Sequence, residues 1–123
     1  NVLEQEILTE ISIPLPKERY ATCFAKLARN AGDIAKLNCA VRVCMVDGKF
    51  SDVRIALGAV APTVVRPRGV EAKLRGRRLS REDLEPLCAE LSAATSPITD
   101  VRGPDWYRRE AAGRLLLGLL RLR

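Results

Sequence analysis

The sequence predicts an α+β fold, with one antiparallel sheet from a hairpin-rich N-terminal half covered by about three helices from the C-terminal half. Before residue 60, apolar residues alternate with polar ones as in strands, whereas after Pro67 they recur at helical spacing. Strands and helices do not alternate along the chain, which argues against a parallel sheet. A chain of 123 residues has the size of one domain, so we expect residues 1–123 to fold as a single unit. One face of the sheet is then either partly uncovered in the isolated chain or covered by sequence outside it.

Two segments near the N-terminus show strand periodicity. In residues 5–13 the isoleucines share one side, and Pro14 follows them, which predicts a strand over these residues. Residues 20–31 fit both a helical stripe and an alternating strand, so the sequence leaves that choice open.

Residues 34–60 predict a β-hairpin. Asp47-Gly48 lies between two alternating runs and is a strong signal for a two-residue hairpin turn. In the second run we expect one set of side chains to face the core, namely Val53, Ile55, Leu57 and Ala59.

Three helices are predicted after Pro67. The first covers residues 69–75 and ends near Gly76. The second begins with Ser80 as its N-cap and acidic residues in its first turn, and its buried stripe comprises Leu84, Leu87, Cys88 and Leu91. The third begins at Pro104, a residue that suits the first helical position, and runs to about Leu120.

The composition excludes several classes of site. The chain has no histidine, which rules out a Ser-His-Asp or Cys-His nucleophile and any histidine-bound zinc or haem within it. The four cysteines form no CxxC pair, so we expect reduced thiols, most of them in the core. The longest uncharged apolar run covers only residues 115–120, too few to span a membrane. We therefore expect a cytoplasmic protein.

Basic residues are concentrated between residues 66 and 81, in a chain whose formal net charge is +6. This stretch suggests either a nucleic-acid patch or a solvated or interface-facing surface. No aromatic residue lies among these charges to stack on a base, which argues against RNA binding. The cations are Arg66, Arg68, Lys73, Arg75, Arg77, Arg78 and Arg81.

Four segments together carry a resemblance to a known family. They are EILTEISIPLP at 6–16, DIAKLNCAVRV at 33–43, DVRIALGAVAPTVVRP at 52–67 and DVRGPDWYRREAAGRLL at 100–116. In this order and spacing, the chain resembles the C-terminal domain of the FAD-binding medium subunit of molybdenum hydroxylases. That family includes carbon monoxide dehydrogenase and xanthine dehydrogenase.

The resemblance implies an accessory role in an FAD-dependent oxidoreductase. Two earlier domains of such a subunit clasp FAD, and electrons reach it from a molybdenum cofactor through 2Fe-2S clusters in partner subunits. The C-terminal domain would complete the flavin pocket and the subunit interface. The glycine-rich AGGT and TxGGN loops that hold the phosphates are absent from this chain. We therefore expect a piece of a longer chain that, alone, neither catalyses turnover nor binds FAD tightly.

The resemblance also names candidate site residues in segment 24–33. Lys26 and Arg29 match basic positions, and Asp33 an acidic position, near the flavin ring. A cation there would stabilise the anionic reduced ring. The alternatives are surface charges at a strand end for the two cations and a turn residue for Asp33.

The start of the last helix carries a second polar group. We expect Asp100, Arg102 and Arg109 to form a salt-bridged start of this helix, and Trp106 and Tyr107 to be core or interface anchors. Two other functions stay open beside the flavoprotein one: a non-enzymatic interaction or dimerisation module, and an RNA-binding module that uses the basic stretch.

Overall fold

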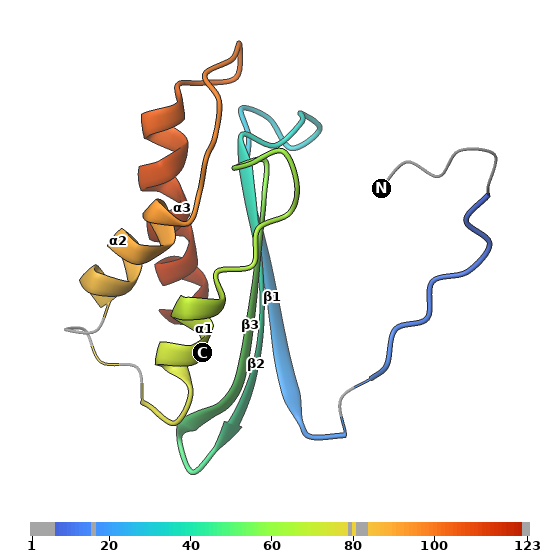
Figure 1. Ribbon diagram of the computed structural model, residues 1–123, viewed down its shortest axis with the longest axis vertical. Helices are drawn as coiled ribbons and strands as arrows, with labels where there is room; N and C mark the ends of the chain where they lie inside the picture. The colour runs from blue at the N-terminus through green and yellow to red at the C-terminus, as the bar shows by residue number, and fades with distance from the viewer. Residues whose placement is uncertain (1–6, 16, 79, 81–83, 122–123) are drawn as a thin grey trace.

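The fold is a three-stranded antiparallel sheet with three helices on one of its faces (Figure 1). The structure is a computed structural model, which describes residues 7–15, 17–78, 80 and 84–121. The strands are β1 (Tyr20–Leu27), β2 (Leu37–Val46) and β3 (Lys49–Gly58), in the order β1-β2-β3. The predicted α+β class is confirmed, and residues 20–27 take the strand alternative.

The central hairpin is the predicted one. Asp47 and Gly48 both have positive φ, 51° and 73°, as a turn of the I′ type requires. Val53, Ile55 and Leu57 are fully buried under the helices. Ala59 was expected among them but is exposed, because the strand ends at Gly58 and the chain turns with a φ of 62° at Ala59.

The strand predicted for residues 5–13 is wrong over the part that the structure describes. Residues 7–15 are in no helix or strand and run on the side of the sheet opposite the helices (Figure 1). Their aliphatic side chains lie in solvent, with Ile7 87% and Ile11 71% exposed. Apolar and polar residues do alternate in this segment, but it pairs with no strand of the described sheet, which contains only β1, β2 and β3. Residues 5 and 6 lie outside the described part.

The helices are α1 (Arg68–Leu74), α2 (Leu84–Ala93) and α3 (Asp105–Arg121). Gly76, with a φ of 74°, follows α1 as expected. The predicted first turn of α2 involves residues 81–83, which lie outside the described residues, as does the side chain of Leu84. α3 begins one residue later than predicted, and the Thr99 hydroxyl accepts a hydrogen bond from the Asp105 N–H (3.1 Å).

The core lies between the sheet and the helices. Side chains with no exposed surface come from both the sheet and the helices, and the largest of them include Leu37, Ile55, Leu57, Leu91 and Leu116. No disulfide joins the four cysteines, all of which lie in the described residues, and burial raises the pKa of Cys39 to about 12, which keeps its thiol protonated. Among the described residues no helix is both long and apolar enough to cross a membrane.

Candidate functional site

The three candidate residues meet where β1 ends and the chain turns towards β2. The Lys26 ammonium donates hydrogen bonds to the backbone carbonyls of Ala31 (2.6 Å) and Asp33 (3.0 Å). These bonds tie the loop of residues 28–36 back onto the strand. Lys26 is exposed, so its charge stays at the surface while it orders the loop.

Arg29 and Asp33 face each other across this loop. Arg29 Nε lies 3.4 Å from Asp33 Oδ2, and the Arg29 side chain is 78% exposed. The Asp33 N–H donates to the carbonyl of Asn30, as in a turn. Asp33 Oδ2 is covered by protein yet accepts no hydrogen bond in the structure, although the whole side chain is 34% exposed. An exposed pair of this kind adds little stability, which leaves Arg29 available for another partner.

A turn from a distant part of the sequence completes this end of the molecule. Val101 and Arg102 lie with Arg29, Asp33, Ile34 and Lys36 around a pocket of about 430 Å³. Val101 is 99% and Ile34 73% exposed. The Lys36 ammonium lies 5.7 Å from the centre of the Tyr107 ring, so α3 helps to place it. We call this set, with Lys26, the loop end.

Sequence reasoning missed Lys36, Ile34 and Val101. Lys36 carried a usable signal, since it follows Asp33 by three residues within the motif at 33–43. Val101 carried none, because its place depends on how the start of α3 meets the loop.

The polar start of α3 differs in part from the prediction. Asp100 pairs with Arg102 (2.7 Å), as expected, but its second partner is Arg108, which is 3% exposed. Arg109 pairs instead with Asp105 (3.6 Å), one helical turn away. Hydrogen bonds from Arg102 hold the pKa of the Asp100 carboxyl below its ordinary value. Trp106 is 62% exposed, so it is not a core residue.

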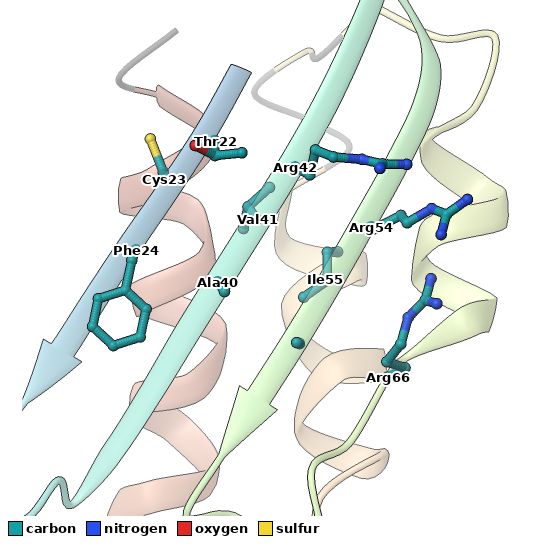
Figure 2. A pocket seen from close by; sticks show the side chains of 10 residues that line it. Thr22, Cys23, Phe24, Ala40, Val41, Arg42, Arg54, Ile55 and Arg66 are labelled. Atoms are coloured by element: carbon teal, nitrogen blue, oxygen red, sulfur yellow. The ribbon is translucent and has the colours of Figure 1, made fainter. Parts of the chain in front are cut away.

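The second notable surface is the face of the sheet that the helices leave open. Its register aligns Phe24, Ala40 and Ala56 in one row and Thr22, Arg42 and Arg54 in the next. Figure 2 shows these side chains with the helices behind the sheet. The two alanines leave a hollow of about 410 Å³ beside Phe24, which is 65% exposed.

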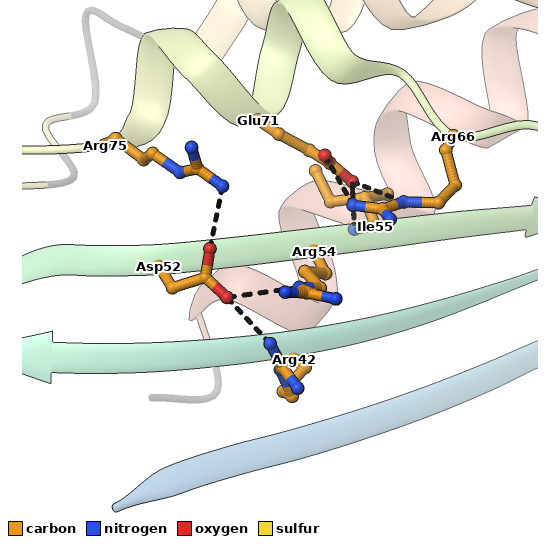
Figure 3. Close-up of polar contacts among 7 residues, drawn as sticks. All are labelled: Arg42, Asp52, Arg54, Ile55, Arg66, Glu71 and Arg75. Atoms are coloured by element: carbon orange, nitrogen blue, oxygen red, sulfur yellow. Dashed lines mark hydrogen bonds and ion pairs between the residues drawn. The ribbon is translucent and has the colours of Figure 1, made fainter. Parts of the chain in front are cut away.

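Asp52 forms ion pairs with three arginines beside this hollow (Figure 3). Its carboxylate accepts from Arg42 (2.7 Å), Arg75 (2.8 Å) and Arg54 (3.3 Å). Burial alone would raise the pKa of Asp52, but these three hydrogen bonds outweigh it and hold the pKa below its ordinary value. Three guanidinium groups thus share one carboxylate.

Glu71 joins α1 to the outer edge of β3 (Figure 3). Although its side chain is only 5% exposed, Glu71 Oε1 accepts from the Ile55 N–H (2.8 Å) and both oxygens accept from Arg66. Buried charges of this kind need a paired and hydrogen-bonded setting, which Glu71 has.

The sequence profile described as the CO dehydrogenase flavoprotein C-terminal domain matches residues 22–121, which includes all six described elements except the first two residues of β1. The chain belongs to this family. This match confirms the family that the four sequence motifs indicated.

Individual relatives agree with the family. The chain is 36% identical over 111 residues to the carbon monoxide dehydrogenase medium chain of Afipia carboxidovorans, covering 90% of this chain and 38% of that one. It is 30% identical over 105 residues to the glyceraldehyde dehydrogenase medium chain of Sulfolobus acidocaldarius, covering 85% and 37%. The chain therefore spans less than two fifths of the length of these relatives.

A solved structure shows the same fold. A chain of reconstituted CO dehydrogenase from Oligotropha carboxidovorans superposes with a TM-score of 0.82 at 33% identity, covering 89% of this chain and 38% of that one. The sheet with one helical layer is thus the fold of this flavoprotein domain.

The arginine-rich stretch of this flavoprotein domain is largely engaged within the protein. Arg66 pairs with Glu71 and Arg75 with Asp52, while Lys73 pairs with Glu90 (2.5 Å). Arg78 donates to the carbonyl of Asp47 (3.0 Å). These contacts tie α1 and the residues after it to the sheet and to α2, which favours the structural interpretation over an RNA patch. Arg81 lies outside the described residues.

Proposed function

We propose that this chain is the C-terminal domain of the FAD-binding medium subunit of a molybdenum hydroxylase, forming one domain of a longer polypeptide. Its role is to complete the flavin pocket and the interface between subunits. The match over residues 22–121 and the coverage of less than two fifths of each relative support this proposal. The FAD-clasping domains of the same subunit and the iron–sulfur and molybdenum subunits are then its partners.

The observation that carries the proposal is the charge of the loop end. Lys26, Arg29 and Lys36 stand beside a single described carboxylate of the loop, that of Asp33. A positively charged surface of this kind stabilises negative charge that develops next to it. Lys26 also fixes the loop backbone, so its charge has a defined place.

The residues present fit contact with the ring of a flavin better than with its phosphates. The chain has neither of the glycine-rich loops that hold a pyrophosphate, and its loop end offers cations and exposed aliphatic side chains instead. When bound, FAD takes up electrons from the molybdenum and iron–sulfur centres and passes them to an acceptor. Lys26 and Arg29 would face its ring, and Asp33 would order the loop that presents them.

The proposal places the subunit in the cytoplasm. The four cysteines are not joined in disulfides, which suits a reducing compartment, where thiols are not converted to disulfides.

Absorption spectroscopy tests the division of labour. After incubation with FAD and removal of free ligand, we expect flavin bands from the complete subunit and none from residues 1–123 alone. Flavin retained by the short chain at near one equivalent would contradict the proposal, because the phosphate loops would then be dispensable. Circular dichroism of the short chain serves as the control for folding.

The Lys26→Ala variant of the complete subunit tests the loop end. Loss of a surface cation beside the ring should lower the flavin midpoint potential by about 20 mV or less, since a surface charge interaction is worth about 1 kcal/mol. Spectroelectrochemical titration measures this potential. Lys49→Ala is the matched control, because Lys49 is also exposed but lies at the opposite end of the sheet. Equal midpoint potentials in the two variants would show that Lys26 does not act on the flavin.

A further inference from the structure

The open face of the sheet has the chemistry of a docking site. Its middle row is apolar, with the exposed Phe24 beside the small Ala40 and Ala56, so a side chain of a partner finds a hollow rather than a flat surface. Exposed apolar surface that is bordered by charges is typical of an interaction site.

The charges beside the hollow favour an acidic partner. Arg42, Arg54 and Arg75 share the single carboxylate of Asp52, which leaves two positive charges without a matching negative charge in this cluster. Arg54 and Arg75 are 54% and 53% exposed, so both can reach a second carboxylate. Arg42 Nε is buried and donates no hydrogen bond in the structure. Because this nitrogen has almost no exposed surface, a partner meets only the exposed part of the Arg42 side chain, which amounts to 23%.

The size of the face favours a segment of the same polypeptide over a separate chain. The part of the face in which β1 lies beside β2 and β3 is eight residues long, so ordinary strand dimensions give it about 14 by 26 Å, or about 360 Å². That is less than half of the roughly 800 Å² per partner that separate proteins bury in a stable complex. A segment linked to this domain needs less contact area, because linkage raises its effective concentration. Residues 7–15 lie on this same side of the sheet but stand away from it with their side chains exposed, so they leave the face open (Figure 1).

We propose that the open face is the docking site for an acidic segment of the same flavoprotein subunit, outside residues 1–123. The segment places an aliphatic or aromatic side chain in the hollow between Phe24 and Ala56 and a carboxylate against Arg42 and Arg54. This inference rests on the proposed function, because it requires the remainder of a flavoprotein subunit.

Photo-crosslinking in the complete purified subunit tests the docking. Phe24→p-azidophenylalanine keeps an aromatic ring of similar size at the centre of the face. After irradiation and mass spectrometry, we expect a crosslink to a peptide of the same subunit that lies outside residues 1–123 and contains Asp or Glu, whereas a crosslink only to residues 1–123 would contradict the proposal. Trp106→p-azidophenylalanine is the control, since Trp106 is equally exposed (62%) but belongs to α3 on the other layer, and should not capture that peptide.

A charge variant makes the test specific. Arg54→Glu, combined with the photo-probe at Phe24, should lower the crosslink yield roughly fivefold or more through like-charge repulsion. Arg114→Glu, at an arginine of α3 that is 79% exposed, should leave the yield unchanged. If Arg54→Glu lowers the folded yield of the subunit, Arg54→Gln replaces it with a smaller expected loss.

Three further results would overturn the docking: no crosslink from Phe24, a crosslink to a second copy or to another subunit, or a yield that Arg54→Glu leaves unchanged. Flavin absorbance recorded on the same samples separates the two proposals. A subunit that retains FAD but gives no crosslink refutes the docking alone. A complete subunit that shows no flavin bands contradicts the proposed function instead.

Discussion

Glu71 illustrates how one buried carboxylate organises its surroundings. It accepts from the backbone of β3 and from Arg66, so both a strand edge and a guanidinium depend on it. Removing Glu71 would leave the buried Ile55 N–H without its acceptor, and an unsatisfied buried donor costs more than the bond itself contributes.

We expect Glu71→Ala to lower the free energy of unfolding by about 1–3 kcal/mol, because the buried Ile55 N–H loses its acceptor while Arg66, which is 34% exposed, can turn to water. Glu90→Ala should lower it by about 1 kcal/mol or less, because Glu90 pairs with Lys73 at a surface where Lys73 is 60% exposed. Urea unfolding of both variants measures the difference. Glu71→Gln, which keeps an acceptor for the Ile55 N–H, should fall between them. Similar decreases in the free energy of unfolding for Glu71→Ala and Glu90→Ala would show that Glu71 contributes no more to stability than a surface carboxylate.

At the scale of elements, α3 contains two glycines with different surroundings. A Cβ on Gly113 would lie 3.0 Å from the Cβ of Cys88 and 3.3 Å from its Cα, so α2 and α3 approach closely here. A Cβ on Gly118 would meet nothing within 4 Å. We therefore expect the same substitution to have opposite effects on stability at these two sites of one helix.

Gly118→Ala should raise the free energy of unfolding by about 0.5–1 kcal/mol, through better helix propensity. Gly113→Ala gains the same propensity but forces α2 away from α3, and we expect a net loss of about 1–3 kcal/mol from overpacking. Thermal melting of the two variants against the parent protein gives the signs directly. A stabilised Gly113→Ala protein would mean that α2 shifts without cost.

The elements also show what sequence reasoning can reach. The hairpin around Asp47-Gly48 and the helices after Pro67 were predictable, because turn chemistry and periodicity are local properties. The strand predicted for residues 5–13 was wrong over its described part. Alternation shows that a segment could fit into a sheet, but strand formation also needs a neighbouring strand to pair with, and local sequence does not encode that partner. At the candidate site, the sequence could group Lys26, Arg29 and Asp33 because they lie close together along the chain, and in the structure both cations contact Asp33. Val101 joins them only through the packing of α3, and no local pattern encodes that.

At the scale of the whole molecule, Asp52 links stability to pH. Its pKa in the folded protein lies below the ordinary value of 3.8, so the folded state binds fewer protons than the unfolded state near that pH. The stabilisation by Asp52 is therefore complete above about pH 4 and is lost as the pH falls through the folded pKa.

We expect the free energy of unfolding to fall more steeply below pH 4 in the parent protein than in Asp52→Asn. At pH 7 the variant should be the less stable of the two, because three guanidinium groups lose their shared carboxylate. Urea titrations at pH 7, 4 and 3 measure both effects. Asp47→Asn, in the turn of the same hairpin, is the control: the contact of Arg78 is with the Asp47 backbone carbonyl, which the substitution keeps. Parallel pH profiles for the parent and Asp52→Asn would rule out this linkage.

The order of the strands has a consequence for how the domain is made. Strands that are neighbours along the chain are also neighbours in the sheet, so two successive hairpin closures can build it from local contacts. During synthesis the sheet is complete in sequence before α3, the last of the six elements, emerges. Until then, the surface that Leu116 and its neighbours cover stays open to solvent. A ribosome that pauses between α2 and α3 would thus expose an apolar sheet face to chaperones, and this domain would become competent to join its subunit only after α3 is released.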